Sequence, residues 1–228
     1  CCQLCAVMIL LGRILLGLAS TLVTLRYSLG LYAWQLSNKL EKPKYATLLQ
    51  LPGGVEIRQY EPYTIAEATF PRGTAMKKAT GNGFRACAGY IFGRKNRVGG
   101  LFARKSSRTM AMTAPVRMVT TAEEQAVTKV SFVMASNETV RSLPTPTDAN
   151  VKIRSVPGHT AAFVRFSGPP PSEELIAKSR ARVEAALASS AYEPVHSSET
   201  LTYGYHDPFA TPNLLRRNEV GVYVLAKH

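Results

Sequence analysis

Two segments of the chain alternate apolar and polar residues in the same way. Val55–Phe70 and Val151–Phe166 carry Val, Ile, Arg, Thr, Ala and Phe at equivalent positions, with a constant offset of 96 residues and no gap. Alternation with a period of two is typical of strands that bury one face, and Glu61-Pro62 is a turn signal within the first copy. We therefore expect each copy to form a β-hairpin.

Each copy is followed by a helical pattern and then by two further strands. In the first half, Phe84, Cys87, Ala88 and Ile91 are spaced as on one face of a short helix, after a loop over residues 71–83. In the second half, a longer helix is expected over residues 172–190, with Ser172 as its N-cap. The following strands are expected at residues 109–118, 127–134, 201–205 and 220–225. The order ββαββ, present twice, predicts an α+β fold with two helices on a curved antiparallel sheet.

The two halves are expected to share one core. Residues 45–142 and 151–226 are joined by the linker Pro144–Asp148, and neither half has enough apolar surface to bury alone. We therefore expect one domain over residues 45–228, preceded by a hydrophobic helix within residues 1–44. A duplicated domain of this kind is expected to form its cleft where the halves meet.

The N-terminal segment over residues 4–36 is almost entirely apolar. Arg13 and Arg26 interrupt it and leave only 12 uninterrupted residues, too few to span a bilayer. Spanning therefore places one arginine at membrane depth, which costs about 2.5–3.5 kcal/mol on insertion scales. A face of small and hydroxylated residues is typical of membrane helices that pack against a partner; here it consists of Arg13, Gly17, Ser20, Thr24, Ser28 and Gln35.

Two interpretations of this segment follow. In the first, the helix inserts into a membrane beside a protein partner, and Lys39, Lys42 and Lys44 place the domain on the cytoplasm-like or stroma-like side. In the second, the segment is a signal or transit sequence that matters only for delivery. We expect the first.

The charge of the chain points to an anionic partner. The formal net charge is +13, which suits anionic lipid, nucleic acid or an acidic ligand. The densest basic stretch, residues 94–108, holds six cations without an acid and is typical of a solvated loop. No nucleic-acid motif accompanies it, so we expect no nucleic-acid partner.

The chain lacks the signals of a disulfide framework, a metal site or an enzyme. Three of its four cysteines (Cys1, Cys2 and Cys5) crowd the N-terminus, which suggests acylation or apolar filling rather than metal binding, and a reducing compartment. The histidines, at positions 159, 196, 206 and 228, are scattered, and no catalytic constellation is recognisable. We expect a binding protein and no enzymatic activity.

Several motifs resemble one known family. They are Val55–Tyr60 (VEIRQY), Tyr90–Gly93 (YIFG), Met110–Val116 (MAMTAPV) and the stretch Tyr205–Val220. In this order they resemble the SOUL haem-binding family, most closely its plant and algal plastid members, over about residues 45–226. The resemblance implies a distorted antiparallel β-barrel flanked by two helices, and reversible, non-covalent binding of haem or a related tetrapyrrole. Phe209-Ala-Thr-Pro212 carries one residue more than the family pattern.

The expected tetrapyrrole site is largely apolar, because no histidine lies between residues 45 and 158. His206 is the best-placed candidate for an axial ligand, with a surface position as the alternative. Cys87 is expected in the core, and Arg216–Glu219 as a structural brace. The apolar wall is expected to comprise Phe84, Ala88, Ile91, Phe92, Met110, Met112, Tyr205 and Phe209, with Lys77, Lys78 and Arg85 pairing with propionates.

Three functions are therefore considered. The first is a membrane-anchored tetrapyrrole carrier in the chloroplast, on the thylakoid membrane with its domain on the stromal side. The second is a structural accessory subunit of a photosynthetic complex such as a photosystem, docked by its N-terminal helix and without bound haem. The third is a small-molecule sensor, since similar duplicated folds bind effectors in transcription regulators.

Overall fold

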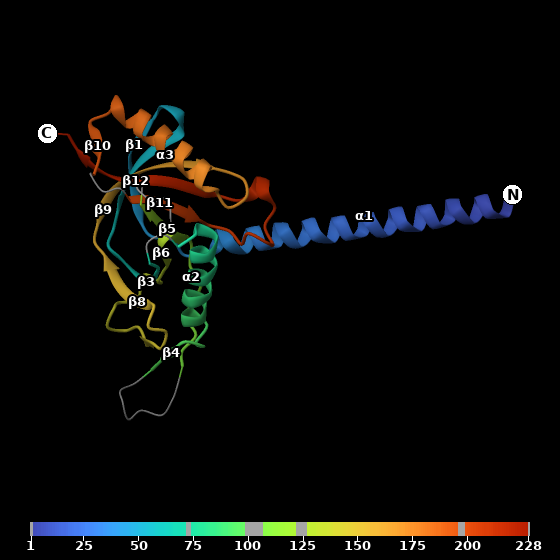
Figure 1. Ribbon diagram of the computed structural model, residues 1–228, viewed down its shortest axis with the longest axis horizontal. Helices are drawn as coiled ribbons and strands as arrows, with labels where there is room; N and C mark the ends of the chain where they lie inside the picture. Colours follow the sequence, from blue (N-terminus) through green and yellow to red (C-terminus); the bar gives the residue numbers. More distant parts are fainter. Residues whose placement is uncertain (1, 72–73, 99–106, 122–126, 196–198, 228) are drawn as a thin grey trace.

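The computed structural model describes residues 2–71, 74–98, 107–121, 127–195 and 199–227 (Figure 1). Among these residues it has three α-helices, α1 (Cys2–Lys39), α2 (Met76–Ile91) and α3 (Glu173–Ala188). One strongly curled antiparallel sheet carries α2 and α3, while α1 projects away from it. The expected α+β class, with its half-barrel sheet and N-terminal apolar helix, is confirmed. Cys1, the middle of the basic stretch, His196 and His228 lie outside the described residues, as do the side chains of Cys2 and Cys5.

Nine strands follow one another across the sheet in the order β1-β2-β9-β12-β11-β5-β6-β3-β8, and β10 pairs with β12. A two-stranded ribbon, β4 with β7, lies apart from it. The strands are β1 Tyr45–Leu51, β2 Val55–Tyr60, β3 Tyr63–Thr69, β4 Asn96–Arg97, β5 Val116–Thr121, β6 Val127–Val133, β7 Thr145–Pro146, β8 Val151–Val156, β9 His159–Phe166, β10 Tyr192–Pro194, β11 Glu199–Gly204 and β12 Asn218–Ala226.

The predicted internal hairpins are wrong, because the repeated segments exchange strands. β2 pairs with β9 and β3 pairs with β8, so each copy pairs with the other copy. Val55 is opposite Val164, and Ala68 is opposite Val151. Under the 96-residue offset Val55 corresponds to Val151 and Ala68 to Val164, so the two pairings are equivalent. An alternating pattern identifies a buried strand face but does not identify the neighbouring strand.

The helices α2 and α3 cover different parts of the sheet. α2 lies on β3 and β6, and α3 lies on β9, β10 and β12 (Figure 1). α2 begins at Met76, within the predicted loop, despite Gly81 and Gly83 in its sequence. A Cβ at Gly83 would come within 2.6 Å of Val130 Cβ, so glycine is needed there for α2 to approach β6.

α3 matches its prediction closely. Ser172 Oγ accepts a hydrogen bond from the Leu175 amide at 3.2 Å, which caps the helix. Its inner face is buried at Ile176, Ser179, Val183 and Leu187.

α1 contacts the domain only through its C-terminal part. The Arg26 guanidinium donates hydrogen bonds to the carbonyl oxygens of Phe209 at 2.7 Å and Ala210 at 2.8 Å. Gly30 is buried against Pro212, where a Cβ would come within 2.8 Å of the proline ring. Among the described residues, the segment Gly12–Lys39 is long and apolar enough to cross a membrane, and little of it is buried.

A buried ion pair joins the two halves of the sheet. Arg58 on β2 donates two hydrogen bonds to Glu219 on β12, at 2.8 and 3.0 Å, and neither side chain is more than 2% exposed. Arg217 and the Tyr205 hydroxyl also donate to Glu219. Burial raises the pKa of Glu219, but the hydrogen bond and charge of Arg58 outweigh burial, so its pKa is lowered overall. The expected brace at Arg216–Glu219 therefore has its main partner at Arg58.

Removing the Glu219 charge should destabilise the fold strongly. Glu219→Gln removes the fully buried partner charge of Arg58 and leaves it only the partly exposed carboxylate of Glu56. We expect the free energy of unfolding in urea to fall by about 3–5 kcal/mol. Glu199→Gln is the matched control, because it breaks the partly exposed pair with Lys129, and a loss below about 1 kcal/mol is expected. Equal losses in the two variants would contradict the brace.

Candidate functional site

An apolar cavity of about 220 Å³ lies between the first-half helix α2 and the second-half strand β11. The segment before β5, the loop after β11 and the end of α1 complete its wall. Its main lining residues are Ser37, Leu40, Thr80, Phe84, Met112, Val116, Met118, Pro171, Thr202, Tyr205, His206, Pro208 and Arg216. The cavity therefore lies between the two halves, where the duplication leads one to expect a cleft.

Three residues that line this cavity each have a buried polar side-chain atom without a hydrogen-bond partner among the described residues. The atoms are Nε2 of His206, Oγ1 of Thr202 and the hydroxyl oxygen of Tyr203. A buried polar atom that is left without a partner costs free energy, and native proteins rarely carry one without a reason. A ligand with acceptor atoms would satisfy the donors among these three groups.

The surroundings of His206 determine what its ring can do. Nδ1 accepts a hydrogen bond from the backbone N–H of Arg217 at 3.0 Å, so the neutral ring carries its proton on Nε2. A protonated Nε2 cannot coordinate iron, but it can donate a hydrogen bond into the cavity. His206 is therefore suited to bind an acceptor rather than to serve as an axial ligand.

Cations predominate around His206 at this end of the cavity, where the Asp207 carboxylate also lies and accepts hydrogen bonds from two loop amides. Burial lowers the pKa of His206, and the charges of Arg217, Lys42, Arg165 and Arg216 lower it further. A concentration of cations around a neutral donor favours an anionic group, for example a carboxylate.

The structure brings together four of the twelve residues that the sequence suggested for the site. Phe84, Met112, Tyr205 and His206 line the cavity. The other eight do not line it: Ile91 and Met110 are buried in the core that includes α2, with Ala88 packed against it, while Phe92, Phe209, Lys77, Lys78 and Arg85 are exposed.

Other lining residues were missed by the sequence reasoning. Thr202 and Met118 occupy ordinary strand positions, and nothing in their spacing distinguishes them from core residues. Ser37 and Leu40 reach the cavity because the end of α1 lies against the domain, which no local pattern indicates.

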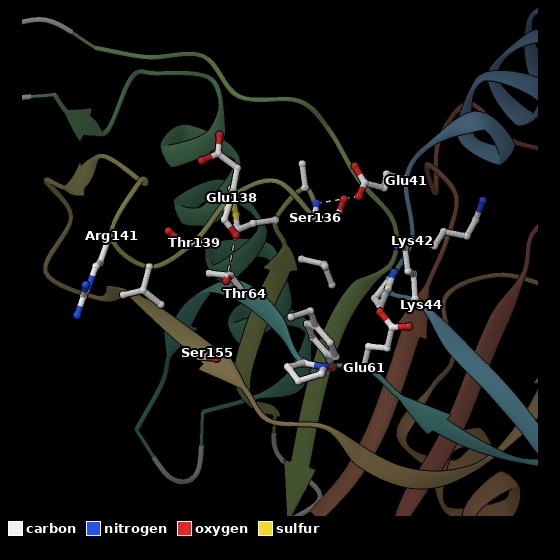
Figure 2. A pocket seen from close by; sticks show the side chains of 17 residues that line it. Glu41, Lys42, Lys44, Glu61, Thr64, Ser136, Glu138, Thr139, Arg141 and Ser155 are labelled. Atoms are coloured by element: carbon white, nitrogen blue, oxygen red, sulfur yellow. Dashed lines mark hydrogen bonds between the residues drawn. The ribbon is translucent and has the colours of Figure 1, made fainter.

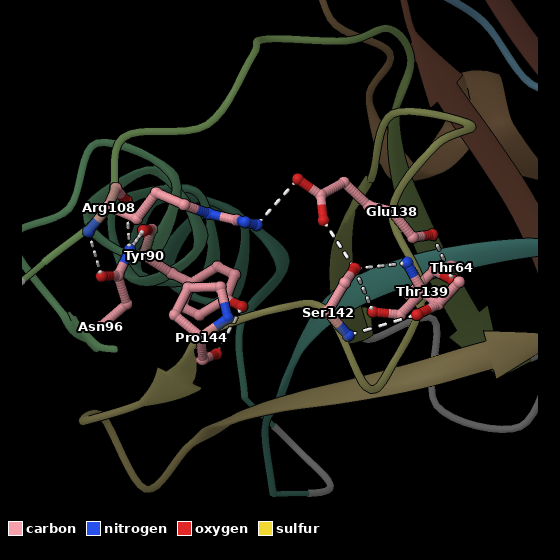
Figure 3. Close-up of polar contacts among 8 residues, drawn as sticks. All are labelled: Thr64, Tyr90, Asn96, Arg108, Glu138, Thr139, Ser142 and Pro144. Atoms are coloured by element: carbon pink, nitrogen blue, oxygen red, sulfur yellow. Dashed lines mark hydrogen bonds and ion pairs between the residues drawn. The ribbon is translucent and has the colours of Figure 1, made fainter. Parts of the chain in front are cut away.

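A hydrogen-bond network fixes the segment that leads into the cavity wall (Figure 3). The Asn96 side chain donates to the carbonyl oxygens of Tyr90 at 2.6 Å and Arg108 at 2.7 Å, and it accepts from the Arg108 amide at 3.0 Å. The Arg108 guanidinium then donates to Glu138 at 2.7 Å. These contacts hold the chain just before Met110 and Met112 in place.

A second cavity, of about 590 Å³, is larger but has mixed charge (Figure 2). Its charged groups are partly engaged already: Glu41 accepts from the Ser136 amide at 2.7 Å, and Lys42 donates to the Asn38 carbonyl at 2.7 Å. The wall also contains Lys44, Glu61, Glu138 and Arg141. An apolar ring system gains little from such a wall, so the smaller cavity is the better candidate for its binding.

The described residues contain no group of three His, Cys, Asp or Glu side chains that could hold a metal ion. Cys87 is fully buried in the core, and burial raises the pKa of its thiol to about 12. It is therefore a protonated core residue at neutral pH, as the sequence led us to expect.

The cavity fits one edge of a flat ring system with an acidic substituent. Its volume is below the roughly 300–1,000 Å³ of typical ligand pockets, so a tetrapyrrole would extend beyond it. The apolar walls suit the macrocycle, and His206 Nε2–H with its neighbouring cations suits a propionate.

Comparison with known proteins supports the family expected from the motifs. The family model described as SOUL heme-binding protein matches residues 40–223. No curated protein sequence matches the chain.

Among solved structures, the C-terminal domain of EcmrR is 11% identical, with a TM-score of 0.51, over 75% of this chain and 97% of that chain. EcmrR in a complex with DNA is 11% identical, with a TM-score of 0.53, over 96% of this chain and 72% of that chain. At this identity the likeness concerns the fold alone.

We predict that His206 stays neutral below its ordinary pKa of 6.5. The unfolded chain then takes up a proton first, so the free energy of unfolding should fall as the pH drops from about 6.5 towards the folded-state pKa. His206→Gln should flatten part of this slope in urea titrations between pH 5 and 8. Burial also lowers the pKa of His159, so this residue should likewise make the free energy of unfolding fall as the pH drops.

Imidazole ¹⁵N NMR measures the His206 pKa and tautomer directly. A pKa at or above 6.5, or a proton on Nδ1 of the neutral ring, would contradict the geometry described above.

Proposed function

This chain belongs to the SOUL haem-binding family, and we propose that it is a membrane-anchored carrier of haem or a related tetrapyrrole. In this proposal the ligand is bound reversibly and non-covalently, and the protein does not transform it. The observation that carries the proposal is the apolar cavity with an unpaired His206 Nε2–H at its positive end.

Each part of the wall has a distinct task in this proposal. Phe84 and Met112 offer apolar surface to one edge of the macrocycle, and the His206 Nε2–H donates to a propionate oxygen. Glu219 fixes Tyr205 through the hydrogen bond that the Tyr205 hydroxyl donates at 2.8 Å. When bound, haem supplies a redox-active iron.

The proposed anchor is α1. Its apolar segment is long enough to cross a bilayer, and little of it is buried against the domain. Lys39, Lys42 and Lys44 follow the apolar segment and favour a domain on the cytoplasm-like or stromal side. With the resemblance to plastid members of the family, these features support a location on the stromal face of the chloroplast thylakoid membrane.

A second candidate function is that of an accessory subunit of a thylakoid complex. The exposed helix face formed by Arg13, Gly17, Ser20, Thr24 and Ser28 supports it, because small residues allow a partner helix to approach closely. The limited cavity volume also favours a domain that does not hold a whole tetrapyrrole.

Titration of the full chain in detergent micelles with hemin tests the carrier proposal. We expect a Soret change and quenching of Trp34, the single tryptophan, at micromolar hemin. His206→Phe should weaken hemin binding roughly 10–100-fold, since a hydrogen bond to a charged group is lost. The same substitution should change the binding of hemin dimethyl ester little, because this ligand has no carboxylate.

Lys77→Gln is the charge control, because Lys77 is exposed and does not line the cavity. Absence of any hemin binding would overturn the carrier proposal and favour the accessory subunit. Equal affinity for hemin and its dimethyl ester would overturn the role of His206.

A further inference from the structure

The loop Asp207–Leu215 is held by hydrogen bonds within itself and to Arg26 of α1. The Asp207 carboxylate accepts hydrogen bonds from the amides of Phe209 at 2.7 Å and Ala210 at 2.6 Å. Arg216 donates to the Thr211 carbonyl at 2.8 Å. Several of the loop's backbone groups are therefore satisfied internally, and Arg26 of α1 binds two of its carbonyl oxygens.

This loop presents two large apolar side chains to its surroundings. Phe209 is 85% exposed and Leu214 is 87% exposed, the largest values among the exposed apolar side chains described. A loop whose hydrogen bonds fix it in this shape while its apolar side chains face outward indicates an external apolar contact.

The position of the loop identifies that contact. Figure 1 shows it at the edge of the domain where α1 leaves, on the side that faces the N-terminus. From Cys2 to Leu25, α1 continues beyond the loop for about 36 Å at 1.5 Å per residue, enough to cross a hydrocarbon core of about 30 Å. Of the apolar segment Gly12–Lys39, the part up to Leu25 then lies in the membrane, and Arg13 is the arginine at membrane depth. The exposed side chain of Tyr27 lies next to Arg26 along the helix, and tyrosine and arginine are typical of the membrane–water boundary.

We propose that the loop Asp207–Leu215 rests on the bilayer that α1 enters, with Phe209 and Leu214 inserted at the boundary of headgroups and acyl chains. The contact between Arg26 and the loop sets the height of the domain, so the membrane surface lies at Arg26. This inference rests on the proposed anchoring by α1. A lipid surface is favoured over a protein partner because the loop continues the apolar surface of α1, and Arg26 lies where both meet.

Two consequences follow from this placement. The segment Tyr27–Lys39 stands outside the hydrocarbon core, and Trp34 lies about 12 Å beyond Arg26 along the helix axis. Pro208, which lines the apolar cavity, directly precedes Phe209. The rim of the cavity is therefore close to the membrane surface, within reach of an apolar ligand dissolved in the bilayer.

The experiment uses tryptophan depth in phosphatidylcholine vesicles whose acyl chains are brominated. In the full chain carrying Trp34→Phe, a Phe209→Trp substitution places the only tryptophan on the loop. We expect bromine to quench at least half of its fluorescence. Val140→Trp in the same background is the control at an exposed position away from the loop, and native Trp34 is a second control; both should lose less than about a tenth.

Flotation of each variant with the vesicles separates the two proposals. If the protein floats but Phe209→Trp is not quenched, the loop does not contact the bilayer while α1 still anchors the protein. If the protein does not float, the anchoring fails, and this inference fails with it. Strong quenching of all three tryptophans would also overturn the inference, because the membrane surface would then not lie at Arg26.

Two glycine variants test the attachment of the loop to α1. In the Phe209→Trp background, Gly30→Ala places a methyl group within 2.8 Å of Pro212, whereas Gly17→Ala meets nothing within 4 Å. We expect Gly30→Ala to reduce the quenching at least twofold and Gly17→Ala to leave it unchanged. Equal quenching in both variants would show that α1 does not set the depth of the loop.

Discussion

The buried pair of Arg58 and Glu219 is the interaction on which the site depends. It joins strands that are 161 residues apart in sequence, and two further donors, Arg217 and Tyr205, converge on the same carboxylate. Tyr205 lines the cavity, and the amide of Arg217 holds the ring of His206. The tautomer of the candidate ligand-binding histidine therefore follows from the position of one buried carboxylate. Such a pair does not guarantee extra stability, since two charges must be desolvated, but it defines one geometry.

The sequence predicted the fold class and most of the elements, because those are local properties. Alternation identified β2, β3, β8 and β9, and the Ser172 cap identified α3. Strand pairing could not be predicted, since the duplicated segments have equivalent patterns and exchange partners. β1 was missed because it is exposed along almost its whole length and has no buried face to produce an alternating pattern. The start of α2 was hidden by Gly83, a residue that local propensity disfavours but that close packing on Val130 requires.

The site was predictable to the extent that motifs mark it. The family motifs led to Met112, Tyr205 and His206, and the helical spacing led to Phe84. The role of His206 as a donor was not predictable, because it depends on the backbone amide of Arg217, which reaches the ring only in the folded chain. The cations near the cavity also differ from those that were expected to pair with propionates. Lys77, Lys78 and Arg85 are exposed and do not line the cavity. The cations near His206 are Arg216 and Arg217 of the same motif, together with the distant Lys42 and Arg165.

The site proposed for the tetrapyrrole is the small apolar cavity between the halves, and not the larger charged one. Paramagnetic broadening tests it most directly: ¹⁵N-labelled full-length protein in lipid nanodiscs is titrated with hemin, whose ferric iron broadens nearby amide signals. We expect the amide signals of Phe84, Met112 and Thr202 to broaden first. Broadening centred on Glu61, Glu138 and Arg141, which line the larger cavity, would contradict it.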